Sequence, residues 1–466
     1  MTEHPELRLE TVDLSELPRR NRSRCPSAPG SYEWWRFEAV DPGARTGCVV
    51  TLHNGLAFSP QYRRQVTRHY DGAGAGRPEL IWPDAHPAVS IAVFHDGKSL
   101  RRSDLLYRSG AFVETGEPWS ARIGPNLLEE TPSGWKLSFR GTPWSLGLGG
   151  PQLHPDEEIQ VELEFRRHLE SPTLERAYLP EQRRVPWPSR RDIPDETANV
   201  IAALERGTEV GEPGKVLSST PDRDVVPEAM PEEEEVEAPE EEGSVDEEAI
   251  PIERPPGQHH WLLSCPSAQV TGTIIVTTKK GKQTLTLENA LGYHDHVWGS
   301  GPIGEGFHCR FATRASWPDG AVVCDLPMYG RYVQVAATFM LFHRTKPPTV
   351  YRGDRVMLTA PQLSAWLLPL PTEMRWRGVR EEVTVHQEAS STIELLAHGA
   401  RGLATIDLTY PDEEEESAHA ARKGMRTVRG LGITELDQYN RMDMPILSRL
   451  IERCLFTNPE PSEGRD

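Results

Sequence analysis

The chain has 466 residues, enough for two or three domains, and a formal net charge of −19 at pH 7. Residues 221–250 hold fourteen Asp and Glu residues against one Arg, so this stretch alone contributes −13 of that charge. The remaining −6 is ordinary for a soluble protein, and we expect no nucleic-acid partner.

Residues 1–30 are polar and rich in proline, and we expect them to lie on the surface or to stay loose. They lack the apolar segment of a signal peptide, and the chain has no run of eighteen apolar residues. We therefore predict a cytoplasmic protein and leave peripheral membrane contact open. The six cysteines form no CxxC pair, which favours reduced thiols over a zinc site or a disulfide framework.

Residues 31–185 show short apolar stretches separated by turn residues about every ten positions, the spacing of antiparallel sheets. Alternation predicts that Tyr32, Trp34 and Arg36 face one way and that Glu33, Trp35 and Phe37 face the other. The paired tryptophans are typical of a barrel base. A carboxylate among aromatic rings is unusual, so Glu33 is a candidate for a pocket. Asn54-Gly55 is interpreted as a turn and residues 57–62 as the end of an aromatic strand.

Residues 186–256 interrupt this pattern with a Pro/Glu-rich acidic linker. A short helix is expected at 195–205. Low hydrophobicity with high charge cannot offset chain entropy, so 207–256 should be disordered. A solvated linker is favoured over an acidic docking arm.

Strand-like runs resume in residues 257–466 and end in an amphipathic helix at 446–455. The two β-rich parts have similar length, which predicts two β-barrels in tandem and an all-β protein. The cluster His259-His260-Trp261 opens the second part. A turn at 278–283 would place this cluster beside residues 292–299 on an adjacent antiparallel strand.

The segment 292–299 is the richest in candidate chemistry. Tyr293, Asp295 and Val297 should share one strand face, and His294, His296 and Trp298 the other. In apolar surroundings the pKa of Asp295 would rise, and the group could act as a general acid oriented by Tyr293. The alternative is that Asp295 caps a turn or pairs with an arginine such as Arg310.

His294 and His296 lie two residues apart, a spacing that suits a metal, with His308 as a third ligand. One such pair does not establish a metal site, and hydrogen-bonded support of the strand end is favoured. The chain contains no nucleophile elbow, phosphate-binding loop or dinucleotide fingerprint in a strand–helix context.

These motifs together resemble the carotenoid 1,2-hydratase (hydroxyneurosporene synthase) superfamily and its AttH-like and lipocalin-like Diels–Alderase relatives. The resemblance is carried by the stretches 31–37, 49–52 with 58–62, 122–126 before Trp135, 259–261 and 292–299. It implies two tandem calycin-like (lipocalin-like) antiparallel β-barrels, with neither a metal nor an organic cofactor, that act on an apolar isoprenoid or polyene.

In the hydratases an acid protonates a terminal double bond and water captures the resulting cation. The resemblance places the catalytic Asp and Tyr of that family on Asp295 and Tyr293, and its His and Trp on His259 or His260 and Trp261. Trp298 would help to shield the cation. The His-Asp-His form at 294–296, and Glu33 beside the tryptophans, look more like the AttH-like and Diels–Alderase branches.

The leading hypothesis is therefore a carotenoid 1,2-hydratase-like hydro-lyase with Asp295 as proton donor. A lipocalin-like protein that only binds an apolar metabolite is the first alternative. A pericyclase or isomerase, in which the pocket mainly preorganises a polyene, is the second.

Overall fold

The structure is a computed structural model. The residues that it describes are 6–12, 15–24, 27–72, 77–147, 150–169, 172–179, 257–303, 309–329, 333–334, 337–344, 347–353, 356–358, 361–363, 369–371, 373–377, 382–395, 399–411, 425–439, 442 and 445–457. The chain divides into one unit of residues 1–182 with 251–466 and a second unit of residues 183–250. The predicted linker, with its helix at 195–205 and its disordered stretch, lies outside the described residues.

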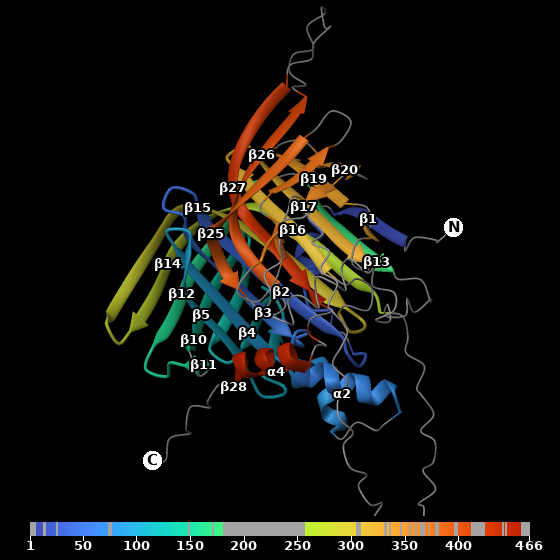
Figure 1. The fold of residues 1–466 in the computed structure, drawn as a ribbon, viewed down its shortest axis with the longest axis vertical. Coiled ribbons are helices and arrows are strands. Elements are labelled where there is room, and N and C mark those ends of the chain that lie inside the picture. The colour runs from blue at the N-terminus through green and yellow to red at the C-terminus, as the bar shows by residue number, and fades with distance from the viewer. Residues whose placement is uncertain are drawn as a thin grey trace, which may run out of the picture. The chain divides into compact units, whose positions relative to one another are not determined.

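The larger sheet of the first unit is antiparallel along its main path (Figure 1). Its order is β11 (Gly150–Leu153), β10 (Trp144–Gly147), β5 (Lys98–Leu106), β4 (Ala88–His95), β3 (Thr46–Asn54), β2 (Tyr32–Asp41), β15 (Gly281–Gly299), β14 (His259–Thr278), β12 (Glu158–Arg167), β9 (Gly134–Gly141), β8 (Asn126–Thr131), β7 (Ser120–Ile123) and β6 (Phe112–Thr115). Off this path, β1 (Glu6–Val12) pairs with β13 (Thr173–Leu179), β13 also pairs with β14, and β28 (Phe456–Thr457) pairs with β5.

The smaller sheet is also antiparallel. Its order is β20 (Thr349–Gly353), β19 (Ala337–His343), β17 (Gly320–Tyr329), β16 (Cys309–Trp317), β27 (Met425–Gln438), β26 (Gly399–Pro411), β25 (Glu382–Leu395), β24 (Glu373–Arg377) and β21 (Val356–Leu358), and β18 (Val333–Gln334) pairs with β17. Strands β22 (Pro361–Leu363) and β23 (Pro369–Pro371) form a separate pair.

The predicted all-β class is therefore confirmed, with two curled antiparallel half-barrel sheets. The division between the sheets falls later in the chain than residue 257, where we placed the start of the second barrel. Strands β14 and β15 belong to the larger sheet, because β14 pairs with β12 and β15 pairs with β2.

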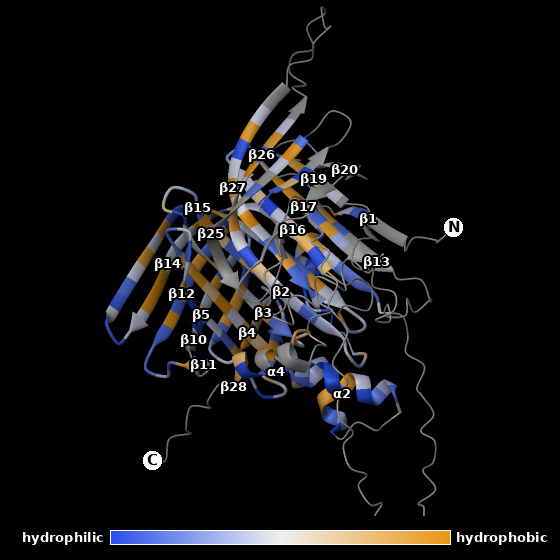
Figure 2. Ribbon diagram, in the orientation of Figure 1, coloured by the Kyte–Doolittle hydropathy of each residue, from blue (hydrophilic) through white to orange (hydrophobic). Residues whose placement is uncertain are grey.

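Alternation of buried and exposed side chains explains how the larger sheet curls around its core. Along β12, Ile159, Val161, Leu163 and Phe165 are buried, whereas the residues between them are partly or fully exposed. Figure 2 shows the same mixture of apolar and polar positions along strands of both sheets. The buried side chains of β12 join those of β2, β3, β4 and β9 in one core, which requires the sheet to close partly on itself.

Two helices of the first unit lie at one end of the larger sheet and contact each other: α2 (Pro60–Tyr70) and α4 (Pro445–Cys454). The predicted terminal helix at 446–455 is α4. Residues 57–62, in contrast, do not end a strand. Ser59 caps α2 by accepting a hydrogen bond from the backbone N–H of Tyr62, and Pro60 occupies the first turn, as helix N-termini favour.

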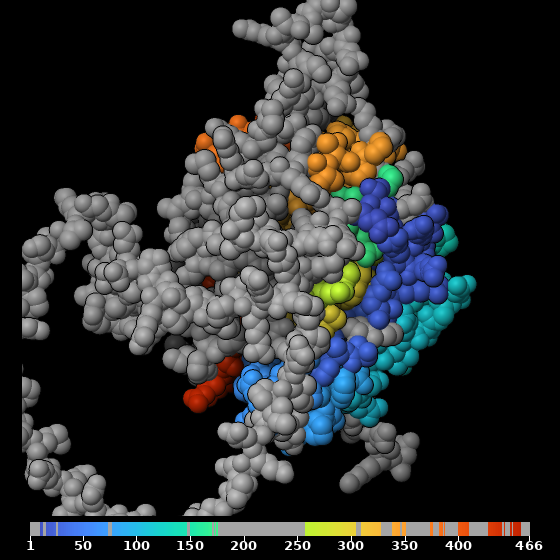
Figure 3. All heavy atoms as spheres, turned by 90° about the vertical axis from the view of Figure 1, so that its right-hand side faces the viewer, coloured from blue at the N-terminus to red at the C-terminus, as the bar shows by residue number. Residues whose placement is uncertain are grey.

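Part of the predicted loose N-terminal arm is bound to the larger sheet. Strand β1 pairs with β13, and in Figure 3 the N-terminal residues, in dark blue, lie beside β13, in green. The short helix α1 (Leu17–Arg20) follows, and Leu17 is buried with Trp298. The backbone carbonyl of Asn21 accepts a hydrogen bond from the indole of Trp35 at 2.9 Å.

Candidate active site

Three neighbouring strands carry the predicted site residues. Strand β14 pairs with β15 so that Trp261 lies opposite Val297 and His260 opposite Trp298, which confirms the expected meeting of the two clusters. Strand β2 pairs with the other side of β15 and places Arg36 opposite Asp295. The face that carries Tyr32, Trp34 and Tyr293 packs against residues of β17 and β19 from the smaller sheet, so the site lies between the sheets.

Asp295 is fully buried, and both of its carboxylate oxygens accept hydrogen bonds. Arg36 donates through Nε to Oδ1 at 3.2 Å and through Nη2 to Oδ2 at 2.5 Å. Oδ2 also accepts from the hydroxyl of Tyr293 at 2.8 Å and from the indole N–H of Trp261 at 3.0 Å. The carboxylate thus fixes the positions of an arginine, a tyrosine and a tryptophan that come from three strands.

The predicted rise in the pKa of Asp295 is wrong. Burial alone would raise this pKa, but the charges of Arg36 and Arg314 and the hydrogen bond from Arg36 outweigh burial and lower the pKa to about 2. Asp295 is therefore an anion at neutral pH and holds no proton to donate. The alternative of an arginine partner is correct in kind, but the partner is Arg36, because Arg310 donates to Asp325.

A buried ionic network extends from Asp295 into the smaller sheet. The second arm of Arg36 donates to Glu435 of β27 at 2.5 Å. Glu435 also accepts from Arg314 of β16 at 2.8 Å and from Arg401 of β26 at 2.7 Å. Arg314 in turn forms a two-pronged pair with Glu38 of β2. These groups are ionic partners across the two sheets, a costly arrangement unless every charge is compensated.

Aromatic side chains line the same face next to the network. Tyr32 stacks on Trp34 with ring centroids 5.1 Å apart, and Phe58 lies 5.7 Å from Trp34 and 6.2 Å from Tyr439. The hydroxyl of Tyr32 is 2.5 Å from Nδ1 of His259. Burial lowers the pKa of His259 to about 3, so its imidazole is neutral at pH 7.

The other predicted residues lie on the opposite face of the three strands. His294 stacks on Phe37 and His296 on Trp35, inside the core of the larger sheet. His260 stacks on Trp298, with ring centroids 4.9 Å apart. Trp298 therefore does not face Asp295, and the expected shielding of a cation by Trp298 together with Trp261 is wrong.

Glu33 is buried on this opposite face and is fully engaged. It accepts from His296 at 2.8 Å, from the hydroxyl of Ser23 and from the backbone N–H of Arg24, both at 2.6 Å. Nδ1 of His294 lies 2.9 Å from the backbone carbonyl of Arg36. These contacts match the favoured interpretation of the histidines as support for the strand end. In the parts of the chain that the structure describes, no group of three metal-ligating side chains is found, and His308 lies outside them.

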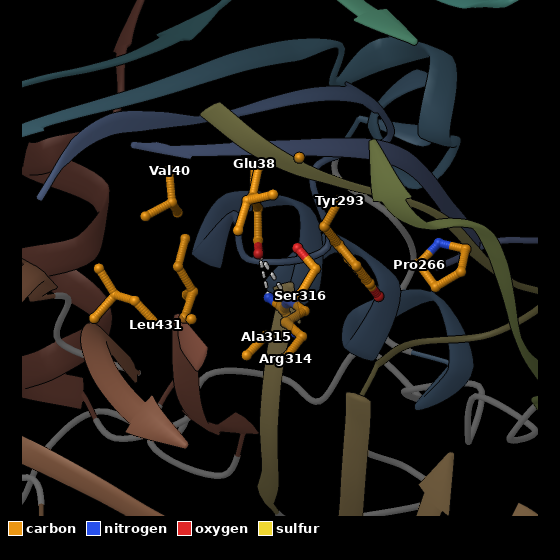
Figure 4. Close-up of a pocket in the computed structure, with 12 residues that line it drawn as sticks. Glu38, Val40, Pro266, Tyr293, Arg314, Ala315, Ser316 and Leu431 are labelled. Carbon is orange, nitrogen blue, oxygen red and sulfur yellow. Dashed lines mark hydrogen bonds and ion pairs between the residues drawn. The ribbon is translucent and has the colours of Figure 1, made fainter. Parts of the chain in front are cut away.

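A small crevice opens beside Tyr293 between the two sheets (Figure 4). It is lined by residues of β2, β14, β15, β16 and β27 that include Glu38, Arg314 and Ser316. The guanidinium of Arg314 lies 4.8 Å from the ring centroid of Tyr293. The space accessible to the centre of a water molecule is about 20 Å³, which suits a water. It is far below the roughly 300 Å³ or more of a pocket for a larger organic ligand.

Sequence reasoning missed the contribution of the smaller sheet. The signal is charged residues at every second or fourth position of otherwise apolar strands. It appears as Arg310 and Arg314 in β16 and as Glu435 and Asp437 near the end of β27. In a buried strand such residues must find partners, which points to a polar interface.

Comparisons with known proteins place the chain near one distant sequence relative and several solved structures. No family model matches the chain. It is 20% identical over 336 residues to a protein named hydroxyneurosporene dehydrogenase from Chlorobaculum tepidum, an alignment that covers 71% of this chain and 65% of that protein. The match thus spans less than two thirds of its relative.

Two crystal structures are similar over most of both chains. One, assigned to AttH from Nitrosomonas europaea, has 12% identity, covers 88% of this chain and 92% of its own, and has a TM-score of 0.44. The other, kievitone hydratase from Nectria haematococca, has 9% identity, covers 92% and 97%, and has a TM-score of 0.41. At these values neither likeness bears on substrate or reaction. Within the described residues, no helix combines the length and apolar character needed to cross a membrane.

Proposed function

We propose that this protein is a cofactor-independent enzyme that acts on an apolar, isoprenoid-like small molecule. The leading reaction is the addition of water to a terminal carbon–carbon double bond, as in a carotenoid 1,2-hydratase. The observation that supports it most is the buried carboxylate of Asp295, which holds Tyr293 and Trp261 beside a wall of aromatic side chains.

The ionic network favours a catalyst over a protein that only binds an apolar metabolite. Burial of paired charges is often neutral or unfavourable for stability compared with apolar packing. A binding cavity for a hydrocarbon requires no such charges, whereas a reaction that passes through a cation does. Concentrations of buried, perturbed ionisable groups are typical of active sites.

In this proposal Asp295 keeps its place in the site but changes its role. Its negative charge, fixed before the reaction starts, stabilises a developing carbocation. Trp261 presents an aromatic ring to the same cation. Tyr293 lies between Asp295 and the crevice, from which water reaches the site. Neutral His259, paired with Tyr32, is available to position water.

The test is to incubate the full chain with a panel of acyclic isoprenoid alkenes in ¹⁸O-labelled water and to analyse the products by mass spectrometry. Hydration predicts an alcohol that carries one ¹⁸O atom. An isomer without ¹⁸O would instead support the pericyclase or isomerase alternative, and unchanged, tightly bound alkene would support the binding protein.

The variants Asp295→Asn and Tyr293→Phe should lose turnover by roughly 10²-fold or more, the range for removal of one preorganised electrostatic group. Asp104→Asn is the matched control, because Asp104 is also a buried carboxylate paired with an arginine, Arg102, but lies on β5. If Asp295→Asn turns over alkene at the wild-type rate, Asp295 has no catalytic role.

A further inference from the structure

Asp437 is a buried carboxyl group that the mechanism above does not use. It lies near the end of β27, two residues after Glu435 and two before Tyr439, and is only 6% exposed. Strand pairing places it opposite Arg310 of β16 on one side and Gly399 of β26 on the other. It therefore belongs to the interface between the sheets, next to the ionic network.

Among the described residues, no hydrogen bond or ion pair reaches the carboxyl group of Asp437. Two arginines whose charges act on Asp437 have other carboxylate partners: Arg310 donates to Asp325 at 2.5 Å, and Arg401 donates to Glu435 at 2.7 Å. A Cβ on Gly399 would come within 2.7 Å of Oδ1, so the carboxyl group occupies space that only a glycine leaves open. In contrast to the carboxyl group of Asp437, those of Asp295 and Glu435 accept hydrogen bonds from guanidinium groups.

The groups around Asp437 raise its pKa far above that of an exposed aspartate. Burial and, next in size, the negative charge of Glu435 together raise the pKa of Asp437 to about 7. Arg401, Arg310 and Arg36 act in the opposite direction from the neighbouring strands but do not outweigh these effects. Tyr439, whose own pKa is raised by burial, adds no charge. Near neutral pH the site thus holds one carboxyl group that can still release a proton.

The aromatic wall begins two residues further along the chain. Tyr439 stacks on Phe58 with an interplanar angle of 13°, and Phe58 packs on Trp34. The charge of Asp437 acts on the hydroxyl of Tyr439, so Asp437 lies at the border between the ionic network and the buried aromatic wall. A general acid requires such a position.

We propose that Asp437 is the proton donor of this site. The inference rests on the proposed function and supplies the acid that Asp295 cannot be. The π electrons of the alkene form a new C–H bond with the Asp437 proton, and the broken O–H bond leaves a carboxylate. Water then forms the C–O bond to the cationic carbon, and its extra proton returns to Asp437. The net change is alkene plus water to alcohol, with nothing oxidised or reduced.

The first experiment needs no substrate. Infrared spectra of the full chain, recorded between pH 5 and pH 9, should contain the C=O band of a protonated carboxylic acid that disappears with a midpoint near neutral pH. Asp437→Asn should remove this band, and Asp104→Asn should leave it. Absence of the band in the wild type, or its persistence in Asp437→Asn, would overturn the proposal.

The second experiment measures alkene hydration by the same variants. Removal of a general acid typically costs about 10²–10⁴-fold in rate, which is the loss expected for Asp437→Asn. Asp437→Glu should keep part of the activity and shift the alkaline limb of the pH–rate profile, a response that a purely structural role would not give. Wild-type turnover in Asp437→Asn would refute the donor role alone. A wild type that hydrates no alkene but shows the infrared band would refute the proposed function, and the donor role with it.

Discussion

Replacement of Asp437 by Asn should make the protein more stable at neutral pH but not at acidic pH. The pKa of this carboxyl group rises from 3.8 to about 7 on folding. Between these values the unfolded chain releases a proton that the folded chain keeps, so the wild type loses stability as pH rises from about 4 to 7. Asn resembles the protonated acid and has no proton to lose.

The size of the effect follows from the shift of about three pKa units, at 1.36 kcal/mol each, and is about 4 kcal/mol. The difference in unfolding free energy between Asp437→Asn and the wild type should grow by this amount from pH 4 to pH 8. The full shift counts, because the group is buried.

Urea unfolding at a series of pH values, followed by tryptophan fluorescence, measures this difference. The difference between Asp104→Asn and the wild type should stay constant from pH 4 to pH 8, because Arg102 helps to lower the pKa of Asp104 below 3.8 despite burial, so the contribution of this carboxylate is lost only below about pH 4. Parallel stability curves for Asp437→Asn and the wild type across the whole range would refute the reasoning about Asp437.

Three further predictions concern the other groups of the site. Tyr293→Phe removes a hydrogen bond to a carboxylate and should lower the unfolding free energy by about 1.5–3 kcal/mol in urea; an unchanged midpoint would contradict it. Asp295→Asn should lower the unfolding free energy by about 3 kcal/mol, which is the lower end of the range for a broken buried ion pair, because Glu435 still compensates the charge of Arg36. Calorimetry would show this loss as a lower Tm. His259 has a folded pKa of about 3, so its contribution to stability should be complete above pH 6.5 and fall as pH drops towards 3. His259→Phe should flatten that part of the stability–pH curve, and an equal slope in both proteins would argue against a neutral His259.

The faces of the strands could be predicted from the sequence, but their partners could not. Period-two alternation placed Tyr32 and Trp34 on one side of β2, and Trp35 with Glu33 on the other, as the packing confirms. Alternation says nothing about which distant strand lies alongside. The pairing of β2 with β15 joins residues that are more than 250 positions apart. The sequence analysis therefore assigned β14 and β15 to the second barrel, whereas both strands belong to the larger sheet.

The same limit explains the error about Asp295. Its neighbours along the strand are Tyr, His and Trp, which suggested an apolar surrounding that would keep the acid neutral. The residue that decides its charge is Arg36, which is 259 positions away in sequence and directly opposite in space. The helix at 60–70 was different, because the Ser59-Pro60 start signal was present in the sequence and was interpreted as a strand end.

The count of charges across the interface explains why Asp437 and not Asp295 keeps its proton. Four buried or half-buried arginines from both sheets meet there: Arg36, Arg310, Arg314 and Arg401. Four carboxyl groups are paired with them: Glu38, Asp295, Asp325 and Glu435. A fifth anion would have no partner, and a buried unpaired charge is far more costly than a proton kept at neutral pH. The acidity of Asp437 is thus set by the whole network, so Glu435→Gln should lower its pKa and Arg401→Met should raise it. A titration midpoint of the infrared band that stays fixed in both variants would show that burial alone controls this group.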